Sequence, residues 1–416
     1  METARVIRST VARIDLDALT HNFRTIREYL ATGRTTPAGL TNPGLIIGLD
    51  TSAGTRVNPI INPGLVKSAA PGIIGVVKAN AYGHGAAAVA LALEQAGADM
   101  VACADIEEAI QLREAGVRCR VLVFGALSLS ALDGIFEHDL TPTLSSPMAA
   151  RAVQSAAERR GVRVRCHLKI DTGMNRLGFR HDNLDRTMPA IAAAPNIEIE
   201  AVYTHFATAD SPGDGWFAQQ QARFDAARAR LAAHQIRPRL VHAANSAATL
   251  SAPGTWFDLV RPGLLIYGVS PDGLAHGLTL KPVMSLHSRV VAVKGVRRGE
   301  IAGYGARFTA DRPTTIAIVP AGYADGLDAR LAGRGHVLVR GCRQPIVGSV
   351  CMDMILVDVT GTEVEPGDAV AIIGQQGDQS IGVAEMARAI GTIPYELLCR
   401  VGTRIERVYN RDSQRS

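Results

Sequence analysis

The sequence predicts an α/β fold, a (β/α)8 barrel of the TIM type, followed by a separate, mostly β C-terminal domain. Three observations lead to this prediction: short apolar runs alternate with helical stretches from about residue 73 to 270, eight such runs occur, and the chain becomes β-rich after about residue 280. Strands that alternate with helices form parallel sheets, because each parallel pairing needs a crossover connection. Eight strands in roughly 250 residues is the size of such a barrel.

The barrel strands are predicted from short apolar runs, of which seven are clear and one, near Thr141, is weaker. The runs are centred near Ile74, Val101, Leu122, Thr141, Leu168, Val202, Val241 and Leu265. Between them, residues 105–115 and 218–233 carry apolar side chains at helical spacing. A doubly wound sheet is the alternative, but no glycine-rich GxGxxG fingerprint follows the first strand.

The domain division follows from the change in pattern near residue 276. We expect the barrel over residues 12–275 and the β-rich domain over 276–416, which an N-terminal strand in 1–11 is expected to join. Runs of β-branched residues separated by turn residues predict the strands of the second domain. Only residues 383–390 have a helical pattern there.

An irregular insertion is predicted at residues 31–71, where Pro, Gly, Asn and Thr are dense and no periodicity is sustained. It connects a helix around Asn22 to the strand that ends at Lys78. Such a connection returns at the N-terminal face of a barrel, whereas the chemistry occurs at the C-terminal ends of the strands. We therefore expect the insertion on the bottom of the barrel, with a flap or an interface element as the alternative.

The composition argues against several classes of function. With 47% hydrophobic and 20% charged residues, the 416-residue chain resembles globular proteins. The net charge of +5 is mild, and scattered basic residues without an aromatic-interleaved patch argue against nucleic-acid binding. No apolar run reaches the length of a membrane span, and no signal peptide is recognisable. The six cysteines lie far apart without the spacing of a zinc site, so we expect no metal and a reducing, cytoplasmic setting.

The segment VVKANAYGHG (76–85) contains the strongest catalytic candidate, Lys78. This lysine lies just past an apolar run, where the side chains of a barrel face the active site. Partial desolvation there favours the neutral amine, which is the form that reacts with carbonyl groups. On position alone, a surface lysine at a strand end explains the pattern equally well.

Eight motifs resemble those of the alanine racemase family, in the family's order and over nearly the whole chain except residues 31–71. They are VVKANAYGHG (76–85), KIDTGMNRLG (169–178), VYTHFATAD (202–210), HAANSAA (242–248), VRPGLLIYG (260–268), GYGARF (303–308), GSVCMDM (348–354) and IPYELLC (393–399). One motif alone could arise by chance, whereas the ordered set is specific. The resemblance implies that the chain binds pyridoxal 5'-phosphate through Lys78.

The same resemblance implies roles for individual residues. Inversion of an amino acid removes a proton from one face of Cα and returns one to the other, which two bases do most directly. Lys78 would act on the D-enantiomer, and Tyr304 of the β domain on the L-enantiomer. The cofactor-binding residues implied by the family are Lys78, Tyr82, His205, Ser246, Arg261, Gly263, Leu264 and Tyr395. Arg176 and the backbone of Met352 would bind the substrate carboxylate, and Lys169 matches a lysine that is carbamylated in several members.

As a function, the resemblance implies two-base racemisation of alanine, for cell-wall peptidoglycan or alanine catabolism, by a homodimer whose sites are shared across the interface. A racemase of serine or of a broader set of amino acids is one alternative. A non-catalytic pyridoxal-phosphate-binding barrel is another, against which the β domain with Tyr304 argues. The sequence departs from the family at Asn175, a glycine in some members, and in the insertion 31–71.

Overall fold

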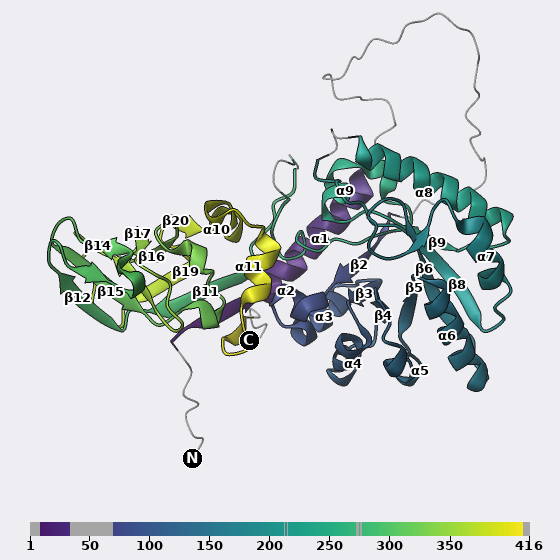
Figure 1. Ribbon diagram of the computed structural model, residues 1–416, viewed down its shortest axis with the longest axis horizontal. Coiled ribbons are helices and arrows are strands. Elements are labelled where there is room, and N and C mark those ends of the chain that lie inside the picture. The colour runs from purple at the N-terminus through teal and green to yellow at the C-terminus, as the bar shows by residue number, and fades with distance from the viewer. Residues whose placement is uncertain are drawn as a thin grey trace, which may run out of the picture.

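Eight parallel strands of the N-terminal half close into a barrel. They are β2 (Gly72–Val76), β3 (Met100–Cys103), β4 (Arg120–Val123), β5 (Thr141–Leu144), β6 (Val164–Asp171), β8 (Ile197–Tyr203), β9 (Leu240–His242) and β10 (Leu259–Val260). They follow the order β5-β4-β3-β2-β10-β9-β8-β6, and pairing of β5 with β6 closes the ring, while β7 (Phe179–Arg180) pairs outside it with β6. The computed structural model describes residues 9–33, 70–211, 213, 215–271, 274 and 277–410. Figure 1 shows the barrel and the β domain as two lobes, and the predicted fold class is confirmed.

The last barrel strand is shorter than the sequence predicts. The apolar run near Leu265 predicts a strand, but β10 ends at Val260 and turns follow. Pro262 has no N–H for a strand ladder. The next N–H, that of Gly263, donates to Ser246 Oγ at 2.9 Å instead. The chain therefore leaves the sheet at this point.

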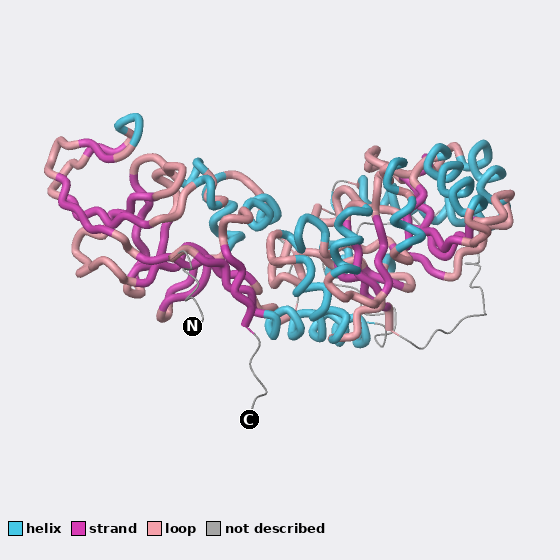
Figure 2. The backbone as a smooth tube through the Cα atoms, turned by 90° about the horizontal axis from the view of Figure 1, so that it is seen from below, coloured by secondary structure: helices cyan, strands magenta, loops and turns pink. Residues whose placement is uncertain are grey.

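Helices cover the outside of the barrel (Figures 1 and 2). They are α3 (Ala86–Gln95), α4 (Ile106–Glu114), α5 (Asp133–Glu137), α6 (Pro147–Arg159), α7 (Leu184–Ala192), α8 (Trp216–Ala233) and α9 (Ser246–Ser251). Local capping explains where two of them begin. Asp105 accepts from Glu108 N–H at 2.8 Å at the start of α4, and Ser146 caps α6, whose first residue is Pro147.

The C-terminal lobe is built on strands that pair antiparallel, except for β21, which pairs in parallel with β1 (Val11–Asp15). They are β11 (Met284–Arg289), β12 (Ala292–Val296), β13 (Ile301–Ala302), β14 (Phe308–Thr309), β15 (Thr314–Val319), β16 (His336–Val339), β17 (Cys342–Val347), β18 (Ile355–Asp358), β19 (Ala369–Gln376), β20 (Gln379–Ile381) and β21 (Glu406–Asn410). The predicted helix is present as α10 (Val383–Ile390). A second helix, α11 (Pro394–Arg400), was not predicted, because seven residues are too few for a helical period to be recognised.

The chain begins its described part in the β domain and then crosses to the barrel. Strand β1 (Val11–Asp15) pairs with β11 and β21, so the expected barrel boundary at residue 12 falls inside a strand of the β domain. Helix α1 (Leu16–Gly33) follows at once and packs on the barrel beside α3. Its Asn22 donates to the carbonyls of Ile266 and Lys281 at 3.0 and 2.7 Å. This side chain therefore ties the end of the barrel to the connection between the lobes.

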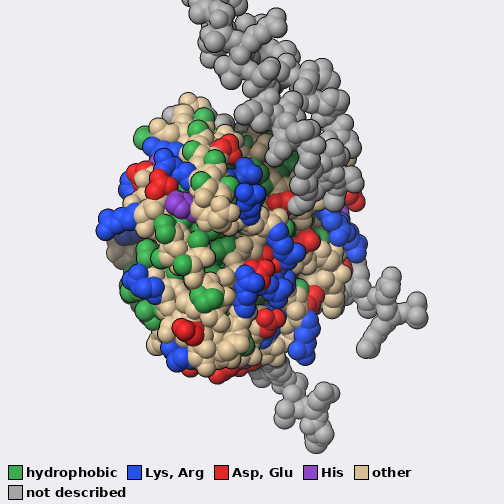
Figure 3. Space-filling model, turned by 90° about the vertical axis from the view of Figure 1, so that its right-hand side faces the viewer, with side chains coloured by type: hydrophobic (Ala, Val, Ile, Leu, Met, Phe, Trp, Pro, Cys, Tyr) green, Lys and Arg blue, Asp and Glu red, His purple; other side chains and the backbone are tan. Residues whose placement is uncertain are grey.

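Residues 34–69 of the predicted insertion lie outside the described residues, so its place at the bottom of the barrel stays a prediction. Over the described part of the chain, no helix combines the length and apolarity that a membrane crossing requires. Figure 3 shows acidic and basic side chains interspersed on the face that it draws, rather than gathered in one basic patch.

Candidate active site

A cavity of about 350 Å³ opens at the C-terminal end of the barrel. Its walls come from the ends of the strands and the loops that follow them, with one further residue from α11 of the β domain. Nine residues that the sequence singled out line it together: Lys78, Tyr82, Lys169, Arg176, His205, Ser246, Arg261, Gly263 and Tyr395. The barrel therefore gathers motifs that are spread over more than three hundred residues of the chain.

Lys78 is held by an unusual turn. In the short segment α2 (Lys78–Tyr82), the four residues after the lysine have φ between 51° and 54°, the left-handed region. Each such residue costs about 1–2 kcal/mol when it is not glycine. Glu108 of α4 stabilises the turn, because its carboxylate accepts from the N–H groups of Ala79 and Ala104 at 2.6 and 2.8 Å. Strain retained in this way is typical of functional sites.

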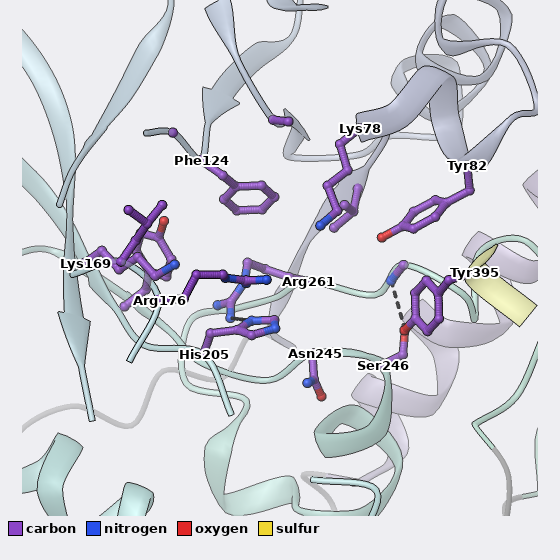
Figure 4. Close-up of a pocket in the computed structure, with 16 residues that line it drawn as sticks. Lys78, Tyr82, Phe124, Lys169, Arg176, His205, Asn245, Ser246, Arg261 and Tyr395 are labelled. Carbon is purple, nitrogen blue, oxygen red and sulfur yellow. Dashed lines mark hydrogen bonds between the residues drawn. The ribbon is translucent and has the colours of Figure 1, made fainter. Parts of the chain in front are cut away.

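The amine of Lys78 points into the cavity toward Arg261 (Figure 4). Burial, reinforced by the charge of Arg176, lowers the pKa of Lys78 below its ordinary value. Burial followed by the charges of Arg176 and Arg261 likewise lowers the pKa of Lys169 to about 8. Both amines therefore lose a proton more readily than a lysine in water, which makes them better nucleophiles and bases.

Arg261 is a fixed cation in the cavity wall. Its guanidinium donates to the carbonyls of Thr204 and Ala243 at 2.8 Å each, and Nη1 lies 2.7 Å from His242 Nδ1. Burial lowers the pKa of Arg261 to about 10, which still leaves it protonated at neutral pH. His205 Nδ1 lies 3.4 Å from Arg261 Nη2. Burial, followed by the Arg261 charge, holds the pKa of His205 well below its ordinary value, so this imidazole is neutral.

Neutral hydrogen-bonding groups gather at another end of the cavity. Ser246 lies against the N–H of Gly263, and the rings of Tyr82 and Tyr395 pack with centroids 5.6 Å apart. A Cβ at Gly263 would lie 2.7 Å from Tyr82 Oη, so glycine is needed for this close approach. Burial raises the pKa of both tyrosines, and their hydroxyls stay protonated. The side chain of Leu264 is buried in the core, so only its backbone can face this end.

Arg176 reaches the cavity from the loop between β6 and β7. The departure from the family at Asn175, just before it, fits the local backbone. Asn175 has a φ of 55°, which asparagine tolerates better than most residues, and its N–H donates to Asp171 Oδ1 at 3.1 Å. The turn that presents Arg176 is therefore kept without the glycine.

Tyr304 and Met352 lie apart from this cavity. Both line a second cavity of about 980 Å³ in the β domain, where their side chains are 77% and 53% exposed. In Figure 1, β14, which follows Tyr304 by a few residues, lies at the end of the molecule farthest from the barrel. Within one chain, the structure does not bring these two residues to Lys78.

Comparisons with known proteins agree with this division of the chain. The family model of the alanine racemase N-terminal domain matches residues 64–271, and that of the alanine racemase C-terminal domain matches residues 283–409. The chain belongs to the alanine racemase family. The family consists of isomerases, and its two domain models cover the two lobes of the fold.

Individual alanine racemases are similar over most of their length. One from Carboxydothermus hydrogenoformans is 43% identical over 340 residues, 80% of this chain and 91% of that protein. Alanine racemase 2 of Caldanaerobacter subterraneus is 36% identical over 406 residues, 97% of this chain and 95% of that protein. The crystal structure from the D-cycloserine producer Streptomyces lavendulae matches 99% of both chains with a TM-score of 0.86 and 33% identity. That from Bacillus anthracis with bound L-Ala-P matches 98% of this chain and 97% of its own, with a TM-score of 0.83 and 33% identity.

Several residues of this alanine racemase cavity were missed by sequence reasoning. Phe124, Tyr203 and Asn245 line it, although the sequence assigned them no role. Each lies at or just after the end of a predicted strand, and that position alone could have identified them. His242, which contacts Arg261, begins the motif HAANSAA but likewise received no role.

Proposed function

We propose that this chain interconverts L-alanine and D-alanine with pyridoxal 5'-phosphate bound through Lys78. The observation that carries the proposal is the amine of Lys78, held by a strained turn in a cavity between the Arg261 cation and a group of neutral donors. When bound, this cofactor withdraws electrons from an amino acid and thereby acidifies its Cα hydrogen. Alanine as the substrate is supported by the names of the relatives.

The residues of the cavity fit this cofactor. The volume of about 350 Å³ lies in the usual range of small-molecule sites. Ser246, the backbone at Gly263 and Leu264, and the hydroxyls of Tyr82 and Tyr395 would hold its phosphate, since N–H and O–H donors suit a phosphate oxygen. Arg261 would donate to the ring nitrogen. Because an arginine only donates, it would leave that nitrogen without a proton of its own.

The substrate would bind at the side of the cavity that lies across from Ser246, where Arg176 and Lys169 lie (Figure 4). Arg176 has the planar donor fork that suits a carboxylate, and the backbone of Met352 from a partner subunit would add a second contact. The lowered pKa of Lys169 leaves part of its amine neutral and able to combine with carbon dioxide. The resulting carbamate would be an anion beside Arg176 and would hold its guanidinium in place. Tyr395 narrows the cavity, which favours a small side chain such as that of alanine.

Two bases would move the Cα proton. Lys78 would take it from the D-enantiomer on one face, and Tyr304 of the partner subunit would take it from the L-enantiomer on the other. A tyrosine needs hydrogen-bonded support to act as a base near neutral pH. His205, neutral and held against Arg261, would provide that support.

We propose a homodimer because one chain leaves the site incomplete. Exposed apolar side chains surround Tyr304 in the β domain, including those of Tyr323, Met352 and Met354. An isologous dimer would cover this face with the barrel of the partner, and each barrel would receive the partner's tyrosine. An exposed apolar patch of this kind on the surface of a monomer favours association with another protein surface.

Subunit mixing tests the shared site. Lys78→Ala and Tyr304→Phe should each be inactive as homodimers, whereas a heterodimer would contain one site with both native residues. Random exchange of equal amounts makes half of the dimers mixed, so about a quarter of the wild-type activity should return. Exchange is confirmed by mass spectrometry of differently tagged subunits. No regained activity after confirmed exchange would mean that the site is not shared.

The activity itself is tested with the purified chain, added cofactor and L-alanine, followed by chiral chromatography. We expect conversion to an equal mixture of both enantiomers. Serine, lysine and arginine are assayed in parallel, and a faster rate with one of them would replace alanine as the substrate. No racemisation of any amino acid would overturn the proposal. The six free cysteines fit a reducing compartment, and we propose the cytoplasm as the place where D-alanine is made for peptidoglycan or removed by catabolism.

A further inference from the structure

A row of four buried polar side chains, those of Arg261, His242, His167 and Glu200, runs from the cavity into the barrel interior. Arg261 Nη1 lies 2.7 Å from His242 Nδ1, and His242 Nε2 lies 3.0 Å from His167 Nδ1. His167 Nε2 lies 3.7 Å from Glu200 Oε2. All four residues are at most 3% exposed. Burying so many polar groups in a barrel core is costly unless they are paired. This row of side chains is therefore a candidate for a specific role.

The hydrogen bonds that join Arg261, His242 and His167 have one direction, whereas the 3.7 Å contact of His167 Nε2 with Glu200 is electrostatic and too long for a hydrogen bond. An arginine can only donate, so His242 Nδ1 must accept from Arg261. His242 then carries its proton on Nε2 and donates to His167 Nδ1. His167 in turn carries its proton on Nε2, which faces the Glu200 carboxylate. Burial lowers the pKa of both histidines, so the two rings are neutral and lie between a cation and an anion.

Glu200 is held in place at the end of this row that is farthest from the cavity. Arg120, the first residue of β4, and Arg239, just before β9, both donate to its carboxylate, and Arg120 Nη1 lies 2.9 Å from Oε1. Although burial favours the neutral acid, hydrogen bonds from its neighbours, both arginines among them, hold the pKa of Glu200 well below its ordinary value. The carboxylate is therefore ionised and fixed in place.

His242, in the middle of this row, is also fixed by packing. The ring of His242 stacks on Tyr203 with centroids 4.5 Å apart and planes 13° from parallel. Tyr203 Oη is itself 3.1 Å from Thr143 Oγ1. The His242 ring therefore has little freedom to turn, and its protonation state alone decides what it offers to Arg261.

We propose that Glu200 is a positioning residue, which acts through His167 and His242 to keep the Arg261 guanidinium in its orientation. The inference rests on the proposed function where it concerns catalysis, because Arg261 is the residue assigned to the cofactor ring. Glu200 itself touches neither cofactor nor substrate. Its negative charge favours the Nε2–H tautomer of His167, and thereby the tautomer of His242 that Arg261 requires, in which Nδ1 is an acceptor.

Glu200→Gln tests this, because it replaces one carboxylate oxygen with N–H₂ and removes the charge with almost no change of shape. Oε1 accepts from both Arg120 Nη1 and Arg239, whereas Oε2 accepts from Arg120 Nη2. The amide oxygen should therefore stay at the doubly bonded Oε1 position, and the amide N–H₂ should lie on the side of Arg120 Nη2 and His167. His167 would then accept at Nε2 and carry its proton on Nδ1. Relayed once more, this places a proton on His242 Nδ1, directly against the Arg261 donor. Two donors cannot share a 2.7 Å contact, so Arg261 must shift.

The first measurement is the tautomer of each imidazole by ¹⁵N NMR of the full chain labelled at histidine. We expect Nε2–H for His242 and His167 in the wild type, and Nδ1–H for His242 in Glu200→Gln. The second is the absorption spectrum of the bound cofactor, which should change because its ring partner has moved. The third is kinetics, where kcat should fall about 10- to 100-fold with KM nearly unchanged, as when a supporting residue misaligns a ligand. Glu198→Gln, on the same strand, is the matched control and should keep wild-type values throughout.

A folded Glu200→Gln with wild-type tautomers and cofactor spectrum overturns the inference. If that variant does not fold, His167→Leu decides. It removes the contacts of His167 with His242 and Glu200 and leaves the ion pairs of Glu200 with the arginines intact. A changed spectrum and reduced kcat in His167→Leu support the inference, and wild-type values refute it. The tautomer measurement needs no cofactor. A wild type that fails to bind pyridoxal 5'-phosphate would therefore count against the proposed function and not against the positioning role of Glu200.

Discussion

Lys78→Ala is expected to abolish racemisation, by about 10⁴-fold or more, because one residue would both hold the cofactor and move a proton. The strained turn that Glu108 holds fixes the place of Lys78 in the cavity wall. Racemase activity and cofactor affinity are measured together. Borohydride reduction of the wild type, followed by peptide mapping, should leave the cofactor on the peptide that contains Lys78.

Lys294→Ala is the control for the loss of a lysine, since Lys294 lies exposed on β12 in the other lobe. It should retain full activity. Cofactor found on the peptide that contains Lys169, the other lysine of the cavity, would contradict the assignment, as would a Lys78→Ala variant with substantial turnover.

Tyr304→Phe is expected to separate the two directions of proton transfer. The variant keeps the aromatic ring and loses only the hydroxyl, so removal of the Cα proton from L-alanine should slow by about 10²- to 10⁴-fold. Removal from D-alanine depends on Lys78 and should be largely spared. Net racemisation fails in both directions, because each needs both bases. The informative measurement is therefore exchange of the Cα hydrogen with deuterated solvent, followed separately for each enantiomer.

Tyr323→Phe is the matched control, since Tyr323 lines the same cavity of the β domain and is also exposed. Any effect of that variant should be equal for the two enantiomers. Equal losses of exchange in Tyr304→Phe would speak against a base on each face and for a general role of Tyr304 in binding.

Local patterns predicted much of this molecule. The apolar run before Lys78 and the strand-helix alternation are short-range features, and a strand and helices formed where they indicate. The motif resemblance added the residues of the cavity, nine of which lie together in the structure. The error at Leu265 has the same local origin, because apolarity alone does not distinguish a strand from a buried turn.

By itself, the sequence determined the fold class, the place of Lys78 at a strand end and nine of the residues that line the cavity. Only the tertiary structure decided that Tyr395 reaches the barrel of its own chain while Tyr304 does not, and that two histidines lie between Glu200 and Arg261. The reason is physical. Periodicity and capping act over a few residues, whereas these contacts join residues that are brought together by barrel closure and domain packing.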